Sequence, residues 1–200
     1  MKAFAIPALL LAFAAAPASA DDSFPFSDTL ERAFRSGGRV RLDLSAGDYE
    51  IRRGTNDALR ILWHTRTAEQ LEQVRVRADV NGDAANIVTD GPGNHFRVVI
   101  ELPQRTDLFL RMSAGDLSIE GVEGNKDVRL RAGDLRIDVG DGTSYSHVDA
   151  AVTAGDLSAR PFGFSTGGLW RSFNHEGSGR FRLRARLWAG DLRLISASPE

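Results

Sequence analysis

Residues 108–119 read Leu-Phe-Leu-Arg-Met-Ser-Ala-Gly-Asp-Leu-Ser-Ile, in which apolar and polar side chains alternate on both sides of an Ala-Gly-Asp tripeptide. Strict alternation is typical of a β-strand with one buried and one solvated face. The tripeptide therefore separates two strands, and it contains the residue types of a tight turn. The tripeptide followed by a large apolar residue occurs five times, at residues 46–49, 114–117, 132–135, 154–157 and 189–192.

The spacing of these copies predicts a repeat architecture. Gly115, Gly133 and Gly155 are 18 and 22 residues apart. A degenerate sixth copy at 81–83 divides the first gap, so each remaining interval of 33 or 35 residues would hold two units. Units of this length predict an all-β, single-domain parallel β-solenoid (β-helix-like), whose coils bury their apolar faces against each other. The alternative is a β-sandwich of the immunoglobulin type, which predicts turns about every 8–12 residues.

The segment 21–38 has a different pattern from the rest of the chain. Asp28 and Glu31 have the spacing of a capping box, and Leu30 begins a short apolar series at helical spacing. We expect a short N-terminal helix there, capping the open end of the solenoid. The expected organisation is a signal peptide (1–20), this lead-in with its capping helix (21–38), the β-solenoid domain (39–195) and a C-terminal tail (196–200).

The first 20 residues have the features of a secretory signal peptide. A lysine at position 2 precedes an apolar run, and Ala18-Ser19-Ala20 forms a small-residue cleavage site. We therefore expect a periplasmic or secreted protein, cleaved near Ala20. No later run is long enough for a membrane helix, so no transmembrane segment is expected in the mature chain. The net charge of −2 does not favour nucleic acid, and the absence of cysteine excludes disulfides.

The repeated tripeptide has a structural and a chemical interpretation. Glycine supplies a turn conformation and aspartate accepts backbone N–H bonds, which explains the motif without any ligand. If Asp116, Asp134 and Asp156 come from consecutive coils, they stack about 4.8 Å apart and need N–H donors, arginine or a cation such as calcium. They are therefore the metal candidates, although corner geometry is the favoured explanation. The predicted turn residues are Gly47, Asp48, Gly115, Asp116, Gly133, Asp134, Gly155, Asp156, Gly190 and Asp191.

Near the C-terminus, the sequence suggests a binding face. Arg180, Arg182, Arg184 and Arg186 fall on one face of a predicted strand and could hold an anionic glycan or phosphate. The other interpretation is the solvated face of an edge strand, where charge discourages aggregation. Trp170 belongs to the same candidate face.

Residues 161–179 form the least repetitive segment. They contain Phe162, Phe164, Trp170 and Phe173 among glycines. These rings either cap the last coils or form a sugar- or protein-binding surface, and we favour the cap.

Patterns that would indicate catalysis are weak. Residues 163–167 match Gly-x-Ser-x-Gly, but a nucleophile elbow needs a strand before it and a helix after it. The four histidines are far apart in sequence and lack the spacing of metal ligands. We therefore predict no catalytic residues and no cofactor, and we expect that the protein is not an enzyme.

The repeats resemble those of the bacterial putative-adhesin β-repeat domains, a group of unknown function. The resemblance is strongest from Leu102-Pro103 through residues 108–121 to Ala132-Gly133-Asp134-Leu135, and it covers roughly residues 39–195. It implies a parallel β-solenoid, and relatives of this group are linked to adhesion and to cell-envelope stress sensing. It supplies no catalytic residues.

From these observations we expect a secreted, non-enzymatic, adhesin-like structural or binding module of the bacterial envelope. Its expected partner is an envelope protein or glycan. Two alternatives stay open: a sensory domain for cell-envelope stress, and a polysaccharide-active β-helix enzyme. The latter needs a cleft with clustered acids and bases, whereas Lys126 is the only lysine after residue 20.

Overall fold

The computed structural model describes residues 24–196, which form one mixed sheet of 15 strands with a single short α-helix and a 3₁₀ turn. The signal peptide and most of the C-terminal tail predicted from the sequence lie outside the described residues. In chain order the elements are β1 (Phe26–Ala33), β2 (Gly38–Leu44), β3 (Asp48–Arg53), β4 (Ala58–Thr65), α1 (Ala68–Gln73), β5 (Arg75–Asn81), β6 (Ala84–Asp90), β7 (Phe96–Leu102), β8 (Thr106–Ala114), β9 (Leu117–Glu120), β10 (Lys126–Ala132), β11 (Leu135–Asp138), β12 (Tyr145–Ala159), η1 (Arg160–Phe162), β13 (Phe164–Glu176), β14 (Phe181–Ala189) and β15 (Leu192–Ile195).

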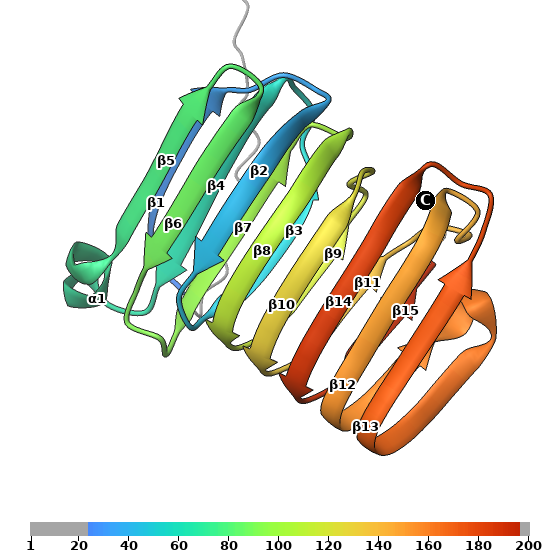
Figure 1. Cartoon of the computed structure of the whole chain (residues 1–200). Helices are drawn as coiled ribbons and strands as arrows, with labels where there is room; N and C mark the ends of the chain where they lie inside the picture. Colours follow the sequence, from blue (N-terminus) through green and yellow to red (C-terminus); the bar gives the residue numbers. More distant parts are fainter. Residues whose placement is uncertain (1–23, 197–200) are drawn as a thin grey trace, which may run out of the picture.

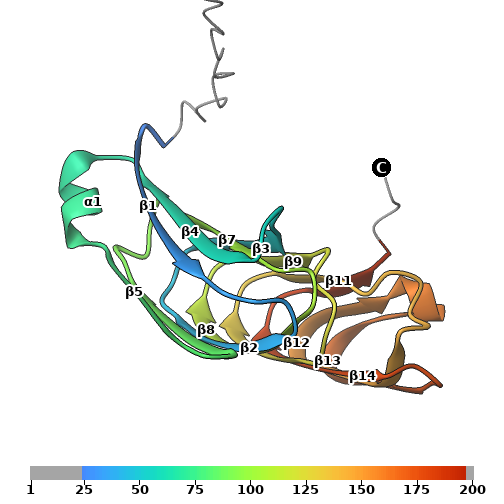
Figure 2. The same cartoon turned by 90° about the horizontal axis from the view of Figure 1, so that it is seen from above.

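The sheet is folded over into two layers that face each other (Figures 1 and 2). The first layer has the strand order β5-β6-β2-β8-β10-β14-β12, and the second has the order β1-β4-β7-β3-β9-β11-β15-β12. The 15-residue strand β12 belongs to both layers, because its first half pairs with β14 and its second half with β15. At the other end β1 and β5 approach each other, so the sheet is nearly closed.

The core lies between the two layers and follows directly from the alternation in the sequence. In β2, Val40 and Leu42 are fully buried while Arg39 and Arg41 are exposed, and β8 and β10 have the same pattern. Parallel register places Val40 beside Leu108, and Leu108 beside Lys126 in the next strand. Apolar side chains from both layers therefore form one continuous cluster.

The prediction of a parallel β-solenoid is wrong for this chain. The sheet is mixed and barrel-like: β1 with β4, β4 with β7, β5 with β6, and β12 with β13 are all antiparallel pairs. The β-sandwich alternative is not clearly supported either, because all the strands belong to one continuous sheet. Parallel pairing is confined to the middle of the sheet. Even there the order differs from that of a solenoid, because β14 lies between β10 and β12 in one layer and β15 lies between β11 and β12 in the other.

The predicted N-terminal capping helix is also wrong. The segment forms β1, which pairs with β4 in antiparallel register, with Leu30 opposite Ile61. The helical spacing of Asp28 and Glu31 is present, but pairing with the free edge of β4 replaces the local helix preference. The free edge of β4 is therefore covered by β1, and the helix at this end of the sheet is α1, which contacts β1 and β4.

The α-helix of the described chain occurs where the sequence was expected to form only strands. Thr67 caps α1 by accepting a hydrogen bond from the Gln70 backbone N–H at 3.2 Å, and the Gln70 side chain accepts one from the Arg66 N–H at 3.2 Å. This is close to the reciprocal arrangement of a capping box. The Thr-x-x-Gln pattern at residues 67–70 could have revealed the helix.

The Ala-Gly-Asp corners lie on top of one another where the chain passes from one layer to the other. A Cβ atom on Gly133 would lie 2.0 Å from the carbonyl oxygen of Gly115, and one on Gly115 would lie 2.0 Å from that of Gly47. Both Gly115 and Gly133 also have positive φ, at 109° and 124°. Glycine is therefore required at these corners for two reasons: the backbone has a positive φ, and the backbone of the neighbouring corner leaves no room for a Cβ atom. The degenerate copy at Gly82 is different, because it forms the turn of the antiparallel β5–β6 hairpin.

Candidate functional site

The corner aspartates form a hydrogen-bonded ladder along the sheet. The backbone N–H of Asp134 donates to the Asp116 carboxylate at 3.3 Å, that of Asp191 donates to Asp134 at 3.2 Å, and that of Asp156 donates to Asp191 at 3.3 Å. Arg193 lies beside the ladder, 3.7 Å from the carboxylate of Asp134 and 2.6 Å from that of Asp191. Backbone donors and one arginine thus offset the repulsion between neighbouring carboxylates.

The order of the ladder differs from the order in sequence. Asp191 lies between Asp134 and Asp156, so the three metal candidates Asp116, Asp134 and Asp156 are not consecutive neighbours. Within residues 24–196 no group of three or more histidine or acidic side chains is arranged to hold a metal ion. The other predicted turn residues lie at the same row of corners: Gly47, Asp48, Gly155 and Gly190.

The arginine-rich strand predicted from the sequence is β14, and it lies inside the first layer. It pairs with β10 on one side and β12 on the other, so solvation of an edge strand does not explain its charges. Arg186 donates two hydrogen bonds to the carboxylate of Asp149 on β12 and one to its backbone carbonyl, and the guanidinium of Arg184 lies 3.6 Å from the same carboxylate. These contacts, the hydrogen bonds of Arg186 above all, lower the pKa of Asp149.

The remaining two arginines of this candidate face lie further from its centre. Arg180 precedes β14 and stacks on the ring of Phe181, with 4.6 Å between the guanidinium carbon and the ring centroid. Arg182 is exposed, and its backbone N–H donates to the side chain of Asn125 at 2.9 Å. The structure thus brings Arg184 and Arg186 together around one acid, while Arg180 and Arg182 extend toward the beginning of the strand.

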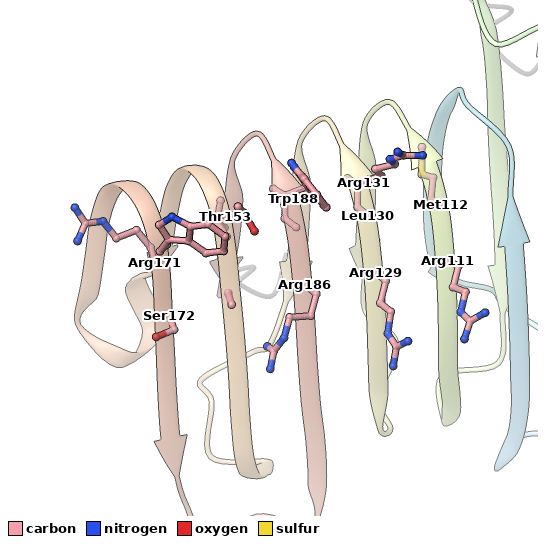
Figure 3. A pocket seen from close by; sticks show the side chains of 14 residues that line it. Arg111, Met112, Arg129, Leu130, Arg131, Thr153, Arg171, Ser172, Arg186 and Trp188 are labelled. Carbon is pink, nitrogen blue, oxygen red and sulfur yellow. The ribbon is translucent and has the colours of Figure 1, made fainter.

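A groove of about 690 Å³ crosses the outer surface of the first layer, and Arg186 is one of the residues that line it. It runs over β8, β10, β14, β12 and β13, as Figure 3 shows from close by. Its lining contains five arginines, two tryptophans and no acidic residue. We call this surface the tryptophan–arginine groove and define it by Arg111, Arg129, Arg131, Arg186, Trp170 and Trp188.

The two tryptophans of the groove are unusually exposed. Trp170 on β13 has 79% of its surface accessible and Trp188 on β14 has 65%. Trp170 also has a positive φ of 55°, a conformation that is rare for a bulky residue, while the register between β12 and β13 is the same on both sides of it. The backbone of β13 thus departs from the usual strand conformation at the residue whose side chain lines the groove.

The segment 161–179 divides its aromatic rings between two roles. Phe162, Phe164 and Phe173 are partly buried, pack against the core and contact one another, with 4.9 Å between the ring centroids of Phe164 and Phe173. Trp170 lies outside this cluster on the exposed surface. Three rings are therefore partly buried against the core, and the fourth belongs to the groove. The segment forms η1 and a strand paired with β12 rather than a cap over solenoid coils.

The Gly-x-Ser-x-Gly match and the histidines do not assemble a reactive site. Ser165 pairs with Ser158 at the beginning of β13, whereas His175 pairs with Val148 near its end. The ring of His175 packs against Phe162, with centroids 4.6 Å apart. His147 contacts the Glu176 carboxylate at 2.6 Å on the rim of the same layer. Ser165 and His175 are therefore held apart by the length of one strand.

One buried polar pair was missed by the sequence reasoning. The Lys126 side chain is 2% exposed and its amine donates to the Tyr145 hydroxyl at 2.7 Å. Burial lowers the pKa of Lys126 to about 8 and raises the pKa of Tyr145. The alternation Lys126, Val128, Leu130 already places this lysine on the inward face, which was the available signal. The pair is enclosed in the core and is separate from the groove.

Comparisons with known proteins concern the fold. A putative cell adhesion protein from Clostridium sporogenes is similar, with a TM-score of 0.55 and 10% identity over 86% of this chain and 100% of that chain. A putative adhesin from Bacteroides fragilis has a TM-score of 0.35 and 11% identity over 86% of this chain and 99% of that chain. A putative lipid binding protein from Parabacteroides distasonis has a TM-score of 0.27 and 9% identity over 84% of this chain and 62% of that chain.

No protein-family model matches the chain, and no curated protein sequence matches it significantly. The described part of the chain also holds no helix of the length and apolarity needed to span a membrane. The similarity to the cell adhesion protein confirms, at the level of the fold, the resemblance to putative adhesins that we inferred from the repeats.

Proposed function

We propose that the chain is a non-enzymatic, adhesin-like binding module of the bacterial envelope or cell exterior, and that the tryptophan–arginine groove is its binding surface. The observation that carries this proposal is the exposure of Trp170 and Trp188 beside a set of arginines. Large exposed apolar side chains rimmed by polar groups are typical of interaction sites on soluble proteins. Arginine is also suited to binding anionic groups, because its planar guanidinium offers several donors.

The composition of the groove supports binding rather than catalysis. General acid–base or nucleophilic catalysis uses groups such as carboxylates, histidines or activated hydroxyls converging on a substrate. The polar side chains that line the groove are instead arginines with one threonine and one serine. Arginine stays protonated at all relevant pH values, so it positions anions without exchanging protons.

Two further observations support the location and the adhesin-like role. The sequence of residues 1–20 predicts export, and the fold is similar to that of a protein described as a cell adhesion protein. Both agree with a module that meets its partner outside the cytoplasm.

Cosedimentation of the purified mature chain with the envelope fraction of the producing cell tests the proposal. We expect saturable binding of the unaltered protein and loss of binding by the double variant Trp170→Asn/Trp188→Thr. Asparagine tolerates a left-handed backbone and threonine suits a strand, so both replacements preserve the fold. Phe26→Ser on β1, which removes an exposed aromatic ring far along the sheet, is the matched control and should bind normally. Equal sedimentation of the double variant and the unaltered protein would contradict the proposal.

A further inference from the structure

Resting on the proposed function, we propose that the tryptophan–arginine groove takes a linear acidic glycan, a chain of sugars that carry carboxylate or sulfate groups. The inference names the class of ligand for the groove. It depends on the order of charged and aromatic side chains across the strands of the first layer.

The arginines of the groove form a row across three neighbouring strands. Arg111 on β8 is the register partner of Arg129 on β10, which in turn is the register partner of Arg186 on β14. Figure 3 shows the three side chains next to one another on the same face. Neighbouring strands lie about 4.8 Å apart, an interval comparable with the length of one sugar unit. A linear anion that crosses the strands can therefore meet one guanidinium after another.

The charge of this row is only partly neutralised within the protein. Arg129 pairs with Asp127, and Arg186 pairs with Asp149. The side chain of Arg111 forms no hydrogen bond or ion pair with any residue in the described range 24–196, and the same holds for the side chain of Arg131. The next position of the row toward β2 is Asp43, which is held by Arg41 and marks the end of the positive stretch.

The neighbouring row of side chains favours a narrow ligand over a membrane surface. Asp127 and Asp149 both lie in register with Arg184, two residues before the arginine row along each strand. That row contains two acids and one arginine and lies about 7 Å away, so the positive row is flanked on one side by a row of net negative charge. A flat sheet of anionic lipid would meet both rows together, whereas a single glycan chain can follow the arginines alone.

The tryptophans lie on the other side of the arginine row. Trp188 follows Arg186 by two residues on the same face of β14, and Trp170 reaches the groove from β13. The flat ring of an indole can stack on the apolar C–H face of a sugar, while a guanidinium binds its anionic group. The strained backbone at Trp170 is consistent with a side chain held out for this purpose.

Affinity electrophoresis and titration with defined probes test this inference. The probes are polygalacturonate and heparin, with uncharged dextran as the neutral counterpart. We expect the unaltered protein to bind both acidic polysaccharides and not dextran. The double variant Arg111→Gln/Arg129→Gln should bind about tenfold more weakly or worse, since it loses two charge-assisted contacts. Trp188→Thr should also weaken binding at constant net charge.

The matched control is Arg136→Gln/Arg160→Gln, which removes the same charge from exposed positions outside the groove. Equal weakening by both arginine pairs would show that binding reflects overall charge and would overturn the inference. Vesicles of equimolar phosphatidylcholine and phosphatidylglycerol form a further arm, and binding that needs these vesicles would overturn the glycan in favour of a membrane surface. If the protein binds the envelope fraction through its tryptophans but no acidic polysaccharide, the glycan fails while the proposed function stands.

Discussion

At the Ala-Gly-Asp corners the polar groups have partners within the chain, whereas the groove side chains directly before two of these corners point into solvent. The Asp134 carboxylate accepts a backbone N–H and faces Arg193, and Gly133 lies against the backbone of Gly115. Arg131 and Trp188, by contrast, are exposed. The repeated Ala-Gly-Asp motif therefore serves the stacking of the corners. The exposed side chains of the groove make few contacts within the fold and are available for binding a partner.

Replacing a corner glycine should have the largest effect on stability. In Gly133→Ala the new Cβ would lie 2.0 Å from the Gly115 oxygen, at a φ of 124°. We expect a loss of about 4 kcal/mol or more in the free energy of unfolding, measured by urea denaturation. Gly140→Ala is the control, because Gly140 also has positive φ but nothing within 4 Å, and it should cost only about 1 kcal/mol. Similar losses in the two variants would show that the close stacking is unimportant.

Lys126 extends the comparison to a polar group inside the core and should make stability depend on pH. Its pKa in the folded chain is about 8, below the value of 10.5 for a free lysine. Between these values the unfolded chain binds a proton that the folded chain has released, so stability rises with pH, by up to about 3 kcal/mol. Above about pH 10 the trend reverses, because tyrosine ionises in the unfolded chain while the raised pKa of Tyr145 opposes ionisation in the folded one.

Urea denaturation of the protein between about pH 7 and pH 9.5 measures this rise, since the window lies below the ionisation of tyrosine. Lys126→Met should flatten the dependence, because the titrating amine is absent. A variant that keeps the original slope would assign the pH dependence to other groups.

The smallest expected effect on stability is that of the groove. Trp170→Asn and Trp188→Thr remove side chains that are 79% and 65% exposed. Each should change the free energy of unfolding by no more than about 0.5 kcal/mol, as is usual for surface positions. Thermal and urea denaturation would measure this, and a loss above about 2 kcal/mol would show that the indoles hold the fold together, which would weaken the contrast with the corners.

Local alternation predicted the strands well, because it depends only on which side chains face the core. It predicted the β2, β8, β10 and β14 strands and their Ala-Gly-Asp corners. It did not predict which strands become neighbours, since the alternation is the same for parallel and antiparallel partners. The segment around Leu30 shows the limit of local patterns, because its helical spacing was overridden by pairing with β4.

The groove could be anticipated only in part. The outward phase of Arg182, Arg184 and Arg186 is visible in the sequence, and the same phase continues to Trp188, which we did not single out. Arg111 and Arg129 join them only because β8, β10 and β14 are neighbours in the folded sheet. Residues so far apart in sequence carry no local signal of their proximity.

The position of β14 and β15 also bears on the order in which the sheet can assemble. These strands follow all the other described strands in the sequence, yet β14 lies between β10 and β12, and β15 lies between β11 and β12. When β12 and β13 become available from the N-terminal side, the strands that separate them from the earlier part of the sheet are not yet in place. The first part of the sheet can form early, but its junction with β12 must wait for the final strands. A chain that stops before Phe181 would therefore lose the connection between two parts of the molecule rather than one strand at its end.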